Sequence, residues 1–101
     1  MNKRPVNGTV KISLSELAEI TGGRLEGDGS VDIHGVCSID RLRAGYIAMA
    51  LGGVKVDWED APEIPAALIT SGKIDGIELP LIVHKNPRLA FTIALRHFHP
   101  D

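Results

Sequence analysis

The sequence has 101 residues, of which 44% are hydrophobic and 24% charged, with a formal net charge of −2 at pH 7. This length predicts one globular domain and excludes a chain with separate nucleotide-binding and catalytic modules. The balance of 11 basic and 13 acidic residues, with 4% aromatic residues, argues against a nucleic-acid-binding surface. A single cysteine excludes an internal disulfide, and no apolar run reaches the roughly 20 residues of a membrane span. We therefore expect a cytoplasmic domain.

The first part of the chain predicts an arm, a short strand and a helix. Residues 1–9 show no periodicity and are expected to form a flexible arm before a domain over residues 10–101, with a strand at residues 10–12. Ser13 and Glu16 have the spacing of a capping box, in which the Ser13 hydroxyl accepts from the Glu16 N–H and the Glu16 carboxylate accepts from the Ser13 N–H. The helix that follows is expected to bury one face and to end at a glycine pair; these residues are Leu14, Leu17, Ala18 and Thr21, then Gly22 and Gly23.

The middle of the chain predicts strands. Residues 24–26 and 31–36 flank a Gly-Asp-Gly sequence, which is typical of an antiparallel hairpin. Residues 38–44 are polar and are expected to form a connection, whereas the continuous apolar run at residues 46–51 favours a buried central strand. Further short strands are expected at residues 66–69 and 79–83, and Pro80 either starts the second of these or places it near a sheet edge.

The last element is a predicted helix. Asn86 is a favourable N-cap, Pro87 suits the first helical position, and Pro100 is expected to end the helix. Its apolar residues predict a broad buried surface; they are Leu89, Ala90, Phe91, Ile93, Ala94, Leu95 and Phe98. The predicted fold is therefore α/β: a single domain with a small mixed sheet of about five short strands, two helices and no β-helix.

Candidate catalytic and metal-ligating residues do not form a recognisable pattern. His97 and His99 point about 200° apart on a helix and cannot chelate one ion, so no metal site is predicted. Cys37 is expected in the core, because a nucleophile needs a base and an orienting group beside it. The acidic residues around Trp58 favour a solvated loop. The candidate anion-binding position is the start of the last helix, where the N–H groups of Arg88 and Leu89 would add to the Arg88 charge.

Two segments carry a family resemblance that spans most of residues 14–100. Residues 23–29, residues 31–40 and Gly45 resemble the beginning of the UDP-3-O-acylglucosamine N-acyltransferases of lipid A synthesis. Residues 80–83 and 86–100 resemble the boundary that precedes the left-handed β-helix in the same family. The resemblance implies an N-terminal substrate-recognition domain that holds the uridine end of a UDP-sugar, needs no cofactor and is not catalytic alone. It also implies that acyl carrier protein acts only through a catalytic domain absent from these residues, and that this chain is a monomer.

The resemblance also implies a set of substrate-binding residues. The acyltransferases place an aromatic residue, an asparagine and a second aromatic residue after the position of Gly45, and they use these to grip the uracil. The same places here hold Met49, Gly52 and Lys55, so that Met49 would pack on the base and Lys55 would offer charge to a diphosphate. Asn86 and Arg88, at the start of the last helix, complete the predicted set.

Two alternatives stay open. Residues 50–57 resemble a segment of the N-terminal domains of Mur ligases, which implies a UDP-muramyl substrate instead. The missing aromatic residues are also compatible with a non-enzymatic interaction module whose nucleotide pocket has decayed.

Overall fold

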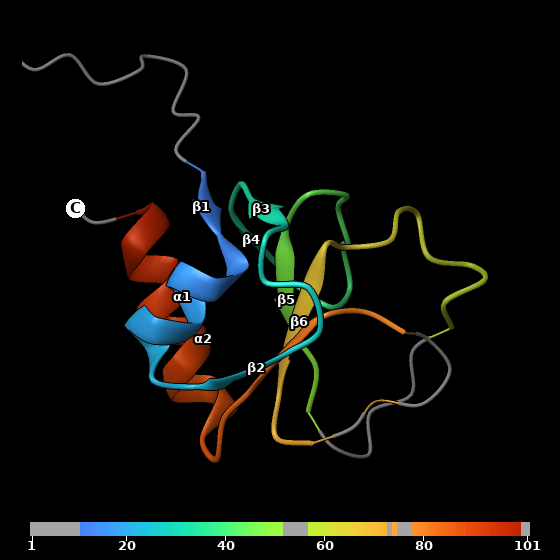
Figure 1. Cartoon of the computed structure of the whole chain (residues 1–101). Helices are drawn as coiled ribbons and strands as arrows, with labels where there is room; N and C mark the ends of the chain where they lie inside the picture. Colours follow the sequence, from blue (N-terminus) through green and yellow to red (C-terminus); the bar gives the residue numbers. More distant parts are fainter. Residues whose placement is uncertain (1–10, 52–56, 73, 75–77, 100–101) are drawn as a thin grey trace, which may run out of the picture.

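The computed structural model describes residues 11–51, 57–72, 74 and 78–99, and Figure 1 shows their arrangement. The predicted arm at residues 1–9 and the predicted helix stop at Pro100 lie outside these residues. The elements in chain order are β1 (Ile12–Ser13), α1 (Leu14–Thr21), β2 (Arg24–Glu26), β3 (Asp32–Ile33), β4 (Val36–Cys37), β5 (Ile47–Met49), β6 (Ala67–Thr70), β7 (Leu81–Val83) and α2 (Pro87–Phe98).

A five-stranded mixed sheet forms the centre of the molecule, in the order β2-β7-β6-β5-β4. Strands β4, β5, β6 and β7 run parallel, and β2 is antiparallel to β7. The prediction of a small mixed α/β domain is confirmed, and so is the prediction that residues 46–51 contain an interior strand. Strand β7 begins directly after Pro80 and lies next to the edge strand β2.

The predicted hairpin between residues 24–26 and 31–36 does not form. Strand β2 pairs with β7, while β3 pairs with β1 in a separate two-stranded sheet. The chain after β2 returns to the beginning of α1, where Leu14 N–H donates to Val31 O at 2.9 Å and Ser15 N–H donates to Gly29 O at 3.0 Å. These non-local hydrogen bonds outcompete the local hairpin, because they bury Ile33 against α1 in the core.

Helix α1 has the predicted ends and the predicted buried face. The Ser13 hydroxyl accepts from the Glu16 N–H at 3.2 Å, Leu14, Leu17, Ala18 and Thr21 are buried, and Gly22 ends the helix with φ of 80°. One detail of the capping box differs from the prediction. The Glu16 carboxylate accepts from the Ser13 hydroxyl at 3.3 Å rather than from the Ser13 N–H. Because Ser13 is also the last residue of β1, its backbone belongs to that strand.

Helix α2 has the predicted N-cap and first-turn proline, but its buried face is narrower than predicted. Asn86 is the N-cap, and the fully buried residues are Pro87, Ala90 and Ala94. Leu89 and Leu95 retain 49% and 39% exposure. They lie about 120° apart on the helical wheel, on opposite flanks of the buried face. A single sheet surface cannot cover both flanks of one helix.

The two faces of the sheet have separate cores. Helices α1 and α2 lie side by side over one face, here called the helix face (Figure 1). Its core side chains include Leu14, Leu17, Ile33, Ile47, Ile69 and Ile82. Connecting segments cover the opposite face, here called the loop face, whose core includes Cys37, Leu42, Ala48, Leu68 and Leu81. Neither helix among the described residues is long and apolar enough to cross a bilayer.

Candidate functional site at the carboxyl edge of the sheet

The parallel strands β4 to β7 end at one edge of the sheet, here called the carboxyl edge. Ligands of open α/β sheets bind outside the carboxyl ends of the strands. Met49 is the last residue of β5 and pairs with Ile69 of β6, which in turn pairs with Ile82 of β7. Since paired residues share a face, Met49 lies on the helix face, where it is half-buried. The structure thus places this predicted site residue at the edge of the sheet and on the side from which α2 begins.

Asn86 and Arg88 reach the same edge from another element, because only three residues separate the end of β7 from the start of α2. Asn86 acts structurally: its side-chain oxygen accepts from the Leu89 N–H at 3.2 Å, and its carbonyl accepts from the Ala90 N–H at 3.1 Å. The expected contribution of the Leu89 N–H to an anion site is therefore wrong, since the N-cap already uses that donor. Arg88 is exposed in the first turn of α2. Strand β7, which leads into α2, is separated in the sheet from β5, the strand that carries Met49, by one strand, β6.

Gly52 and Lys55 lie outside the described residues. Their predicted roles rest on the resemblance alone. The structure therefore brings Met49, Asn86 and Arg88 to one edge of the sheet by topology, and it shows no hydrogen bond between Met49's strand and the start of α2 among the described residues.

His84 is a residue at this edge that sequence reasoning did not connect with the site. It follows β7 directly and is half-buried, and its backbone N–H donates to Thr70 O at 2.9 Å. Its Nδ1 accepts from the Asn86 N–H at 2.9 Å. The His-x-Asn-Pro spacing was visible in the sequence, but only the turn after β7 brings the ring onto the N-cap backbone.

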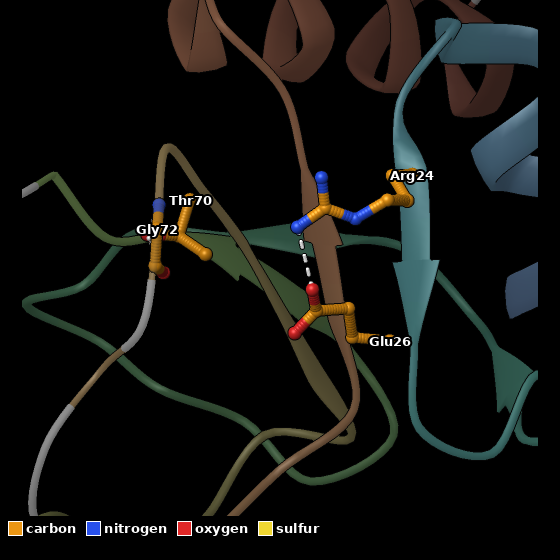
Figure 2. A network of polar contacts seen from close by, with 4 residues as sticks. All are labelled: Arg24, Glu26, Thr70 and Gly72. Atoms are coloured by element: carbon orange, nitrogen blue, oxygen red, sulfur yellow. Dashed lines mark hydrogen bonds and ion pairs between the residues drawn. The ribbon is translucent and has the colours of Figure 1, made fainter.

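On the loop face of the same edge, polar groups form an ion pair and hydrogen bonds with other groups of the fold (Figure 2). Arg24 and Thr70 flank Val83 in register, and the Arg24 guanidinium pairs with the Glu26 carboxylate at 2.6 Å. The buried Thr70 hydroxyl donates to Gly72 O at 2.9 Å and accepts from the Gly72 N–H at 3.2 Å. These contacts close the turn after β6, so Thr70 stabilises the backbone at this edge.

The other candidates have structural surroundings. Cys37 is buried in the loop-face core, and burial raises the pKa of its thiol, which opposes formation of the nucleophilic thiolate. In the acidic segment, Glu63 accepts from the Ala44 N–H at 2.6 Å, and Asp57 accepts from the Asp60 N–H at 3.3 Å. The part of the chain that the structure describes contains no group of three or more His, Cys, Asp or Glu residues placed to hold a metal ion.

Comparison with curated proteins finds relatives for most of this chain. It is 33% identical over 88 residues to UDP-3-O-acylglucosamine N-acyltransferase 1 of Legionella pneumophila strain Paris, covering 87% of this chain and 25% of the relative. It is 32% identical over 91 residues to UDP-3-O-acylglucosamine N-acyltransferase 2 of Gloeobacter violaceus, covering 87% of this chain and 24% of the relative. No family model matches the chain. The chain thus spans about a quarter of the length of these relatives, and over most of its own length it is homologous to UDP-3-O-acylglucosamine N-acyltransferases.

Proposed function

We propose that this chain is a substrate-recognition domain of the UDP-3-O-acylglucosamine N-acyltransferase type, which holds the uridine end of a UDP-sugar. The observation that carries the proposal is the similarity to these acyltransferases, which covers 87% of this chain and a quarter of the relatives. The names of those relatives include a UDP-sugar substrate and an acyl transfer. A piece of this size supplies recognition, while acyl transfer and the contact with acyl carrier protein belong to the remainder of such an enzyme.

The carboxyl edge of the sheet is the favoured place for the uridine. Met49 offers a polarisable apolar side chain at the end of β5, and thioethers pack favourably on aromatic rings. Gly52 and Lys55, which follow it in the sequence, belong to the proposal through the resemblance. Arg88 supplies an exposed cation on the first turn of α2, where helix geometry favours anions. Together these features fit a base beside Met49 and a diphosphate toward the start of α2.

The described residues support binding rather than chemistry. The one thiol is buried and has a raised pKa, and the hydrogen-bonding groups of Asn86 and Thr70 are used within the fold. We therefore propose a domain that orients a substrate without reacting with it. We further propose that the isolated chain is a cytoplasmic monomer.

Thermal unfolding with uridine compounds tests the proposal. A ligand at tenfold its Kd stabilises the folded state by about 1.4 kcal/mol, so millimolar UDP and UDP-N-acetylglucosamine should raise Tm even when binding is weak. Met49→Ala should abolish most of the shift. Ile64→Ala is the matched control, because Ile64 is an apolar residue of 41% exposure that precedes β6, at the opposite edge of the sheet.

The same experiment separates the alternatives. A larger shift with a UDP-acylglucosamine than with UDP-N-acetylmuramate supports the acyltransferase type, and the reverse order supports a Mur-ligase-type domain. No shift with any uridine compound would contradict the proposal and favour an interaction module with a decayed pocket.

A further inference from the structure

His84 links the end of α1 to the beginning of α2 at the carboxyl edge. Its Nδ1 accepts from the Asn86 N–H at 2.9 Å. The opposite side of the ring faces the glycine pair that ends α1: a Cβ added at Gly22 would lie 3.9 Å from Nε2, and one added at Gly23 would lie 3.7 Å from Cδ2. One imidazole ring therefore lies beside the glycine pair that follows one helix and accepts a hydrogen bond from the N-cap of the other.

The hydrogen bond fixes the protonation state of the ring. Nδ1 accepts only when it carries no proton, so the bonded ring is neutral and carries its proton on Nε2. Protonation of Nδ1 would set one N–H against another at the N-cap and remove the hydrogen bond. Histidine is the side chain whose charge ordinarily changes between pH 5 and 8.

Asn86 connects the His84 ring to α2, because its backbone and side chain make hydrogen bonds both to the ring and within the first turn of the helix. Its N–H donates to His84, its side-chain oxygen accepts from the Leu89 N–H, and its carbonyl accepts from the Ala90 N–H. Arg88 is part of the same turn. The His84 ring is therefore connected through Asn86 to the turn that carries the Arg88 charge.

We infer that neutral His84 is a positioning residue that sets the start of α2, and that its protonation loosens this turn. The displacement of Arg88 then weakens nucleotide-sugar binding at the carboxyl edge by more than the positive charge gained by the ring strengthens it. The statement on binding rests on the proposed function. The charged residues of the surrounding elements are Glu16 and Glu19 on α1, Arg24 and Glu26 on β2, and Lys85 and Arg88 beside the N-cap. Arg24 and Glu26 pair with each other. Among the described residues, the hydrogen bond shown to the ring is the one from Asn86.

Nuclear magnetic resonance of the ¹⁵N-labelled full chain from pH 8 to pH 5 tests the positioning role. Imidazole ¹⁵N spectra should show the Nε2–H tautomer of His84 at pH 8, and the Asn86 and Leu89 amide signals should move together as the ring is protonated. His84→Asn is the decisive variant, because its side-chain oxygen can replace Nδ1 as acceptor and does not titrate. In that variant both amide signals should stay near their pH 8 positions throughout. His99→Asn, at the other end of α2, should retain the wild-type response.

Binding of UDP-N-acetylglucosamine, whose doubly esterified diphosphate does not titrate in this range, tests the coupling. We expect Kd to rise at least about threefold between pH 7.5 and 5.5 in the wild type and in His99→Asn, and less than twofold in His84→Asn. An Nδ1–H tautomer, or an Asn86 response that survives in His84→Asn, would overturn the positioning role. A wild-type Kd that stays unchanged or falls at pH 5.5, with a normal amide response, would overturn the coupling. Absence of binding at every pH would instead count against the proposed function, and the amide signals would still decide the role of His84.

Discussion

The two faces of the five-stranded sheet are buried by different means. On the helix face, α1 and α2 present aliphatic side chains at helical spacing, and Leu14, Leu17 and Ile33 are completely buried there. On the loop face, irregular segments contribute Leu42, together with partly buried residues that include Tyr46, Trp58 and Leu79. The Arg43 guanidinium lies 4.4 Å from the centre of the Tyr46 ring, as part of this irregular cover.

The difference shows where the candidate site draws its rigidity. Met49 and His84 lie on the helix face, because Met49 is in register with Ile82, two residues before His84. Packed helices position a site more accurately than loops do, since their backbone hydrogen bonds are internal. The helix face is therefore expected to be the stable side of the molecule, and the loop face the adaptable one.

The largest expected effect comes from truncating one core leucine on each face. Leu17→Ala should lower the free energy of unfolding by about 2–5 kcal/mol, because the cavity lies between two helices and the sheet. Leu42→Ala should cost about 2 kcal/mol, at the lower end of that range, because the connecting segment around Leu42 can relax into the space. Urea unfolding measures both values. Equal losses would show that the two faces are packed equally rigidly.

A glycine on the helix face gives the next effect. A Cβ at Gly23 would overlap Ile82 Cγ2 and lie 3.2 Å from Val83 O, so Gly23→Ala should destabilise the fold by about 1–3 kcal/mol. Gly72→Ala is the control, because an added Cβ at Gly72 meets no described atom within 4 Å. Calorimetry should show a lower Tm for the first variant and a nearly unchanged Tm for the second. A similar Tm for both variants would show that Ile82 and Val83 move aside from the added Cβ at little cost in free energy.

The cap of α1 tests how far local interactions support the helix face. Ser13→Ala removes the oxygen that accepts from the Glu16 N–H and should cost about 1 kcal/mol. Ser13→Thr keeps a hydroxyl that accepts from the Glu16 N–H and donates to the Glu16 carboxylate, so it should recover most of the loss. Circular dichroism during thermal unfolding measures both. If Ser13→Thr is as unstable as Ser13→Ala, the serine contributes through β1 rather than through the cap.

The smallest expected effect is the contribution of the buried Cys37, on the loop face, to the pH dependence of the free energy of unfolding. Burial raises the pKa of its thiol, so the folded state keeps the proton at a pH where the unfolded thiol loses it. Stability from this group is complete below the ordinary thiol pKa of about 8.5 and is lost as pH rises through the higher pKa of the folded state. The free energy of unfolding should fall over that alkaline range in the wild type more than in Cys37→Ala.

A thiol reagent gives a second measure of the same burial. Dithionitrobenzoate at pH 8 should label folded Cys37 much more slowly than the unfolded chain. Labelling at the rate of a free thiol would show that the loop face opens readily, which would sharpen the contrast with the helix face.

Local signals in the sequence predicted the elements but not all of their partners. Ser13, Gly22, Asn86 and Pro87 mark helix ends through contacts within a few residues, and each of these helix boundaries is where the sequence placed it. The Gly-Asp-Gly sequence also predicts a local contact, and there the prediction failed. Strand β2 gains more from pairing with β7 inside the larger sheet than a two-stranded hairpin could offer.

The candidate site shows the same division. The sequence and its resemblance pointed to Met49, Asn86 and Arg88, but the parallel order of β5, β6 and β7 is what brings them to one edge. That order also uses Asn86 for capping and places His84 between two helices, which no spacing in the sequence could reveal. Helix caps, the buried face of α1 and the apolar strands were set by the sequence itself, because their causes act within a few residues. Strand pairing, the carboxyl edge and the contacts of His84 were decided by the tertiary structure, because they depend on which distant segments bury their apolar surfaces together.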